Sequence, residues 1–167
     1  MHRLHNLDYL RGIAAFGIMI YHFSLWNFGA FPAESILGRV GIYGVSIFYV
    51  LSGLTLYHVY FHKMTLSFSS LKDFWIKRIF RIFPLLWLAT ILFVIIERKE
   101  LDFYRIFLNL TGFFGFIKWD YYLAVGSWSI GNELVFYAFL PVFIYLGNNS
   151  KTAFWILSTM ILALGFY

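Results

Sequence analysis

Two residues with anion-binding and acid–base chemistry share the first long apolar run of the sequence. Arg11 and His22 are eleven residues apart, which in an α-helix is about 1100° of rotation, so both side chains lie on one face, roughly 16 Å apart along the axis. Gly12 and Gly17 keep this helix thin and favour close approach of a helix or substrate. Polar groups are costly inside a membrane, so a neutral imidazole here is a candidate proton acceptor. The pair equally fits a membrane-surface arginine and a histidine that hydrogen-bonds between helices.

Arg78 and Arg81 lie about one helical turn apart at the start of another apolar run. Two guanidinium groups on one face can bind a phosphate or a carboxylate, because each presents a planar fork of N–H donors. They also fit a plain surface anchor beside Lys72 and Lys77. Both interpretations stay open at this point.

Glu133 places a carboxylate inside a further apolar run, where it must be neutralised, paired or open to water. Ser129 precedes it by one turn and faces the same way. If this helix enters from the cytoplasm, Glu133 lies only about 8 Å deep, on the same side as the three arginines. We therefore expect these charges to be able to converge.

Two further positions in the run at 40–61 could carry function. Ser52 and Gly53 interrupt aromatic and β-branched residues, which indicates a close helix approach or a site on the backbone. His58 and His62 have the i, i+4 spacing common in helical metal sites. No third ligand is identifiable, so we assign no metal.

The elements that position these residues are expected to lie in a membrane. Of the 167 residues, 61% are hydrophobic and 13% are charged, against a charged fraction of about 25% in soluble domains, and the mean hydropathy is +0.75. The sequence has no cysteine, which excludes thiolate chemistry. The net charge of +5 would suggest nucleic acid in a soluble protein, but the basic residues flank apolar runs, so we expect them to set membrane topology and expect no nucleic acid.

Six apolar runs predict an all-α, polytopic transmembrane bundle that forms one domain over residues 1–167. They lie at about 9–28, 40–61, 79–96, 103–117, 128–146 and from 152 onward, each compared with the roughly 20 residues that a crossing needs. The fourth run is the weakest because it is short and carries Arg105. The first lacks a small-residue cleavage pattern, so we expect it to stay in the mature chain. The sixth is still apolar at Tyr167, so we expect the chain to be incomplete at its C-terminus.

The distribution of Lys and Arg predicts a cytoplasmic N-terminus. With six crossings, Arg3, Arg11, Lys63, Lys72, Lys77, Arg78, Arg81 and Lys118 lie inside, and Arg39, Arg98, Lys99, Arg105 and Lys151 lie outside. The excess is modest, and it would invert locally if the fourth run were re-entrant.

Four blocks, in order along the chain, together resemble acyltransferase family 3, the bacterial integral-membrane O-acyltransferases. LDYLRGIAA at 7–15, with His22, is similar to the family's first-helix pattern of a basic residue, ten residues and a histidine. FYVLSG at 48–53 resembles its second-helix block, and RIFRIFP at 78–84 its paired arginines. SWSI at 127–130 resembles its Ser-Trp-Ser-Leu block, followed here by Glu133, Phe136, Tyr137 and Pro141. Asn132 and Leu134 depart from the residues that are common in the family.

The resemblance implies transfer of an acyl group, often acetyl, from cytoplasmic acyl-CoA to a hydroxyl of an envelope carbohydrate or lipid-linked glycan. It implies that His22 is the catalytic base or acyl relay, that Arg11, Arg78 and Arg81 bind the anionic donor, and that no cofactor is tightly bound. Glu133 could orient the imidazole or pair with an arginine, and Ser52 and Ser129 are candidate donor-binding residues. Family members typically have about ten spans. The resemblance implies that this protein lies among lipids in the bacterial cytoplasmic membrane.

A rival interpretation is a non-enzymatic membrane protein, either a transporter fragment or an assembly subunit. Its intramembrane His and Glu would form a proton or substrate path. A transporter would need an internal repeat or a second half, and no repeat is visible in the sequence.

Overall fold

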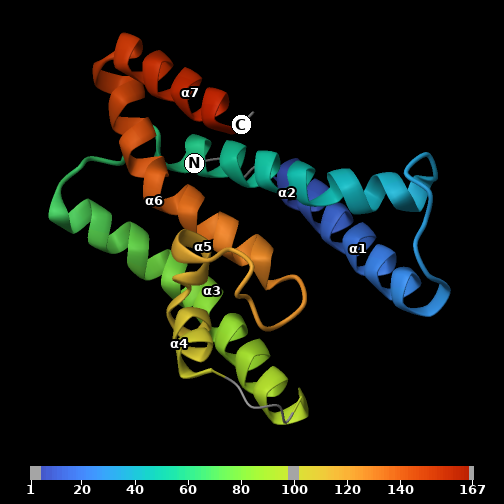
Figure 1. Ribbon diagram of the computed structural model, residues 1–167. Helices are drawn as coiled ribbons and strands as arrows, with labels where there is room; N and C mark the ends of the chain where they lie inside the picture. The colour runs from blue at the N-terminus through green and yellow to red at the C-terminus, as the bar shows by residue number, and fades with distance from the viewer. Residues whose placement is uncertain (1–4, 98–101, 166–167) are drawn as a thin grey trace. The chain divides into compact units, whose positions relative to one another are not determined.

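The computed structural model describes residues 5–97 and 102–165, and all secondary structure in these ranges is helical (Figure 1). The chain divides between His62 and Lys63 into two compact units. Arg3, Arg98 and Lys99 of the predicted charge count lie outside the described residues.

The first unit is a hairpin of two long helices, α1 (His5–Phe28) and α2 (Ile36–Tyr60). Gly29 follows α1 with a left-handed φ of 85°, a conformation that glycine adopts without strain. Ser35 starts α2, because its hydroxyl accepts a hydrogen bond from the Gly38 amide at 3.0 Å. The connection therefore ends one helix and begins the next within a few residues.

Glycines of α2 set the distance between the two helices. A Cβ at Gly44 would lie 2.7 Å from Cγ1 of Ile18, and one at Gly41 would overlap the Tyr21 ring. On α1, Gly17 does face Val40, but Gly12 has nothing within 4 Å of an added Cβ. The close approach predicted for α1 is therefore made mainly by the small residues of its partner helix.

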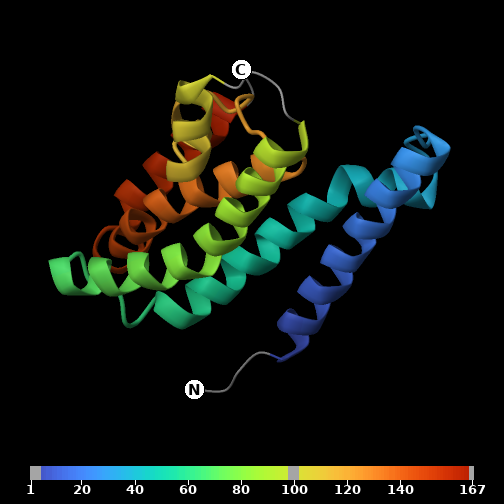
Figure 2. The same cartoon turned by 90° about the horizontal axis from the view of Figure 1, so that it is seen from below.

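The second unit is built on two long helices that run in opposite directions, α3 (Phe68–Glu97) and α6 (Ser127–Asn149) (Figures 1 and 2). Two short helices, α4 (Phe103–Thr111) and α5 (Phe114–Ile117), connect them, and α7 (Lys151–Gly165) follows α6. Leu86, Leu108 and Phe114 form a buried cluster that joins α3, α4 and α5. The short helices are thus packed as part of this unit.

The fourth predicted crossing is wrong, because the run at 103–117 is not one helix. Gly112 takes a left-handed φ of 73° and separates α4 from α5. The nine residues of α4 are about 14 Å long, which is too short for a hydrocarbon core of about 30 Å. The Trp87 indole donates a 2.8 Å hydrogen bond to the carbonyl of Leu110, so α3 satisfies a carbonyl at the end of α4 that the helix leaves unpaired.

The count of about six spans is not confirmed. Within the described ranges, α2, α3 and α6 are the helices long and apolar enough to cross a membrane. The 24 residues of α1 are long enough, but Arg11, His22 and Asn27 reduce its hydropathy. The described apolar part of α7, Lys151–Ala163, is shorter than a full span.

A glycine-to-glycine contact joins α5 to α6. A Cβ added at Gly115 would lie 2.6 Å from Cα of Gly131, and one at Gly131 would lie 2.7 Å from the Phe114 ring. Neither neighbour can withdraw easily, because one is backbone and the other is fully buried. This contact fixes the start of α6 against the short helices.

Gly131→Ala should therefore destabilise the purified protein by about 1–3 kcal/mol, the usual cost of overpacking. Its melting temperature in detergent should fall by several degrees. Gly12→Ala is the matched control, since it adds the same methyl group to a helix with open space around it. An equal melting temperature for Gly131→Ala and wild type would contradict the packing.

Candidate functional site

Arg11 lies on α1 with its guanidinium close to an aromatic ring of α2. Its Cζ is 5.2 Å from the centroid of the Phe48 ring, a cation–π arrangement that stabilises the charge in apolar surroundings. Asp8, one turn earlier, has a carboxylate oxygen 3.9 Å from Nη1. The buried Nε has no hydrogen-bond partner among the described residues. The Arg11 guanidinium therefore packs against Phe48 and still has one N–H donor that could bind an anion.

Ser52 follows Phe48 by one turn of α2 and so lies on the same face of that helix. It is 4% exposed, and its hydroxyl has no hydrogen-bond partner in the described part of the chain. Buried hydroxyls are normally hydrogen-bonded, so this one can take a further partner. The first unit thus places Arg11 against Phe48, and Ser52 one turn from Phe48 on α2.

His22 lies on the same continuous helix as Arg11, three turns further along. Its half-buried ring packs between Tyr21, at 5.3 Å between centroids, and Trp26, at 6.0 Å. The predicted shared face follows from the unbroken helix, and the spacing keeps the two groups apart. An imidazole and a guanidinium placed this way could act on different parts of one long substrate.

In the second unit, Arg78 and Glu133 are brought together by Tyr137 of α6. Tyr137 is fully buried, and its hydroxyl donates a hydrogen bond to the Glu133 carboxylate. The guanidinium of Arg78 lies 5.6 Å from the centroid of the Tyr137 ring and 5.7 Å from that of Phe74. The two rings meet edge to face at 6.0 Å. This cluster confines a cation and a carboxylate around one tyrosine.

The other two predicted residues of this unit lie at its edges. Arg81 is exposed and follows Arg78 by three residues on α3. Ser129 donates a 2.7 Å hydrogen bond to the carbonyl of Gly126 at the start of α6. This hydrogen bond ties Ser129 to the first turn of α6.

The sequence did not predict Tyr137 and Phe74 as partners of the charged residues. Tyr137 follows Glu133 by one turn, and Phe74 precedes Arg78 by one turn. Residues four apart on a helix are neighbours. An aromatic residue at that spacing from each buried charge was therefore the available signal.

Among the described residues, no group of three or more His, Asp or Glu side chains is close enough to hold a metal ion. His58 and His62 are both exposed. The candidate chemistry is that of the arginines, the histidine, the carboxylate and Tyr137.

Comparison with known proteins gives two relatives. YrhL of Bacillus subtilis, whose name provisionally assigns it to the peptidoglycan O-acetyltransferases, is 30% identical over 164 residues, which cover 85% of this chain and 24% of that protein. The peptidoglycan O-acetyltransferase OatA of Listeria monocytogenes is 29% identical over 172 residues, covering 87% and 25%. The chain thus spans about a quarter of the length of these curated relatives. No solved structure matches it significantly.

The family model described as an acyltransferase domain matches residues 4–167. This range includes all four blocks noted in the sequence. The match confirms the resemblance, and the chain belongs to acyltransferase family 3.

Proposed function

We propose that this protein is an integral-membrane O-acyltransferase that moves an acyl group, acetyl by analogy with its relatives, from acyl-CoA to a hydroxyl of an envelope carbohydrate. The observation that carries the proposal is the family match over residues 4–167. The relatives' names support peptidoglycan as the acceptor. A transporter or assembly subunit is not favoured, because both names describe an acyltransferase.

The arginines suit a donor that carries several phosphates. Arg11 is stacked on Phe48, and Arg78 on Phe74 and Tyr137. A guanidinium carries its N–H donors in a planar fork, which can bind phosphate oxygens in pairs. A lysine has no such planar fork, so these sites favour arginine.

His22 would perform the proton transfer. As general base, its imidazole takes the proton of the acceptor hydroxyl while that oxygen attacks the thioester carbonyl. The new ester C–O bond forms, the C–S bond breaks, and the coenzyme A thiolate leaves and takes up a proton. As an acyl relay, the imidazole would first accept the acyl group and then pass it to the hydroxyl. Its position between two aromatic rings limits the orientation of the ring in either role.

The short α4–α5 pair changes the topology that the sequence suggested for α6. Because neither short helix crosses, α6 begins on the side where α3 ends. Glu133 then lies in the N-terminal half of α6, the half farther from the cytoplasm. Tyr137 connects it to Arg78, because the Tyr137 hydroxyl donates a hydrogen bond to Glu133 and Arg78 lies over the Tyr137 ring. If α1 crosses, Lys118 moves outside and Lys151 inside, which leaves eight basic residues inside and five outside of the thirteen. The balance still favours a cytoplasmic N-terminus.

Cysteine labelling in intact cells tests this topology, since the chain has no native cysteine. Ser69→Cys, near the start of α3, should be protected from an impermeant thiol reagent. Val125→Cys, on the exposed connection between α5 and α6, should be labelled from outside. Protection of Val125→Cys together with labelling of Ser69→Cys would reverse the orientation.

His22→Ala should reduce the O-acetyl content of purified cell-wall peptidoglycan to near that of cells without the gene, because a positioned general base contributes about 10²–10⁴ in rate. Membrane insertion should be unchanged, as measured by protein level in the membrane fraction. His22→Gln, which keeps hydrogen bonding, should be equally inactive. Full O-acetylation by His22→Gln would assign the histidine to packing instead.

Tyr137→Phe removes a hydroxyl but keeps the ring beneath Arg78. Losing a hydrogen bond to a charged group costs about 1.5–3 kcal/mol, so kcat/KM for acyl-CoA should fall roughly 10- to 100-fold. Arg78→Lys should raise the KM for acyl-CoA, because it loses the planar fork. Tyr145→Phe, two turns further along α6 and exposed, is the matched control. Wild-type kinetics in Tyr137→Phe would show that the cluster is only structural.

A further inference from the structure

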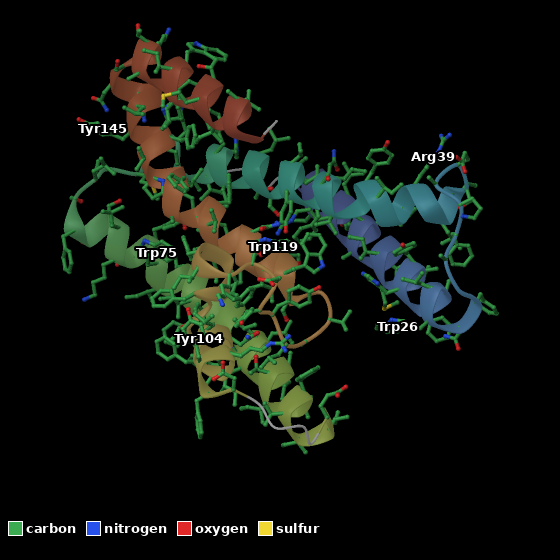
Figure 3. All side chains as sticks on the ribbon, in the orientation of Figure 1. Trp26, Arg39, Trp75, Tyr104, Trp119 and Tyr145 are labelled. Atoms are coloured by element: carbon green, nitrogen blue, oxygen red, sulfur yellow. The ribbon has the colours of Figure 1, made fainter. Side chains whose placement is uncertain are left out.

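A tight turn between α5 and α6 presents two side chains outward. The amide of Tyr121 donates a 2.9 Å hydrogen bond to the carbonyl of Lys118, which makes Trp119 and Asp120 the two central residues of a β-turn. Trp119, labelled in Figure 3, is 73% exposed, and Asp120, next to it in the chain, is also exposed. An aromatic ring and a carboxylate therefore stand side by side at the tip.

Polar side chains of α4 hold the chain that follows this turn. Arg105 donates from Nε to the carbonyl of Tyr121 at 3.3 Å and from Nη2 to that of Tyr122 at 2.8 Å. Asn109, which is fully buried, donates to the Tyr121 carbonyl at 2.8 Å and accepts from the Leu123 amide at 3.0 Å. Four hydrogen bonds from two side chains thus fix three consecutive residues of the loop.

Lys118 is directed back onto the same framework. Its ammonium lies 4.2 Å from the centroid of the Tyr121 ring and donates a 3.1 Å hydrogen bond to the Tyr121 hydroxyl. This hydrogen bond raises the pKa of Lys118. Tyr104 of α4 packs edge-on against Tyr121 at 6.2 Å, and the Lys118 ammonium lies 5.9 Å from the centroid of the Tyr104 ring. The residues that flank the tip are therefore engaged with each other, whereas Trp119 and Asp120 are exposed.

We propose that the turn at Lys118–Tyr121 is a subsite for the acceptor glycan, in which Trp119 stacks on the apolar face of a sugar ring and Asp120 accepts hydrogen bonds from sugar hydroxyls. The inference rests on the proposed function. A pyranose ring presents C–H groups on one face, which suit the negative face of an indole. An ionised carboxylate is an acceptor only, which suits hydroxyl donors. A loop fixed before binding loses little freedom when the glycan binds.

Two features favour a glycan over a lipid headgroup as the occupant. Tryptophans that anchor a protein at the membrane surface need no fixed backbone, and the four hydrogen bonds from Arg105 and Asn109 supply one here. Asp120 is repelled by anionic lipid. In the proposed topology the turn also lies outside, on the side of the envelope glycan.

The test is binding of the full-length protein, reconstituted in lipid nanodiscs, to insoluble peptidoglycan, measured by cosedimentation without acyl-CoA. Trp119→Ala should weaken binding by about tenfold, whereas Trp119→Phe should retain most of it because a ring remains. Trp155→Ala is the matched control, since Trp155 is 64% exposed on α7, away from the turn. No binding by wild type, equal binding by Trp119→Ala, or an equal loss in Trp155→Ala would overturn the subsite.

Turnover separates this inference from the proposed function. Trp119→Ala should raise the KM for glycan about tenfold and leave the KM for acyl-CoA unchanged. A wild-type protein that binds peptidoglycan through Trp119 but transfers no acyl group would overturn the proposed function and support the subsite. A change in both KM values, with a lower melting temperature for Trp119→Ala, would indicate a structural role and overturn the subsite.

Discussion

A guanidinium in an apolar setting must be given partners by the protein, and the structure depends on how three arginines meet that requirement. Arg11 rests on Phe48, Arg78 lies over Phe74 and Tyr137, and Arg105 donates to two loop carbonyls. Arginine is suited to such places because it stays charged, is weakly hydrated and separates its stacking face from its donor edge. In the proposed function, the first two arginines bind an anion. The third uses its donors on the backbone and becomes structural. The residue type is the same, and the neighbours decide its role.

Small residues make these arrangements possible, because stacked arginines require helices that approach closely. Gly41 and Gly44 let α1 lie against α2, and Gly115 and Gly131 do the same for α5 and α6. Gly112 contributes differently, through a backbone conformation that other residues adopt with strain. The chain turns at Gly112 and ends α4 there. Arg105 and Asn109 of α4 can therefore hydrogen-bond to the connection that leads to α6.

The sequence predicted most of the helices, since apolar runs are local signals, and isolated charges in those runs marked the candidate site residues. The failure at 103–117 has a physical cause. Apolar composition alone cannot distinguish one long helix from two short ones, and the break depends on the φ of Gly112 and on the Trp87 bond to Leu110. Tyr137 was missed as a partner for a related reason. Its role depends on two helices, α3 and α6, whose pairing no local pattern specifies. The sequence shows where the charged residues occur along the chain, whereas their partners depend on tertiary packing.

Helix α6 connects the proposed glycan subsite to the proposed donor site. It begins just after the connection that carries Trp119 and Asp120, and ten residues into the helix its Tyr137 ring contacts Arg78. From Ser127 to Tyr137 the helix rises about 15 Å, roughly half of a hydrocarbon core. In the proposed function this half-helix separates the glycan at the turn from the donor phosphates at Arg78. A thioester carried on a long, flexible donor can extend over such a distance. In that proposal, the acyl group is therefore the partner that covers the distance between the two ends.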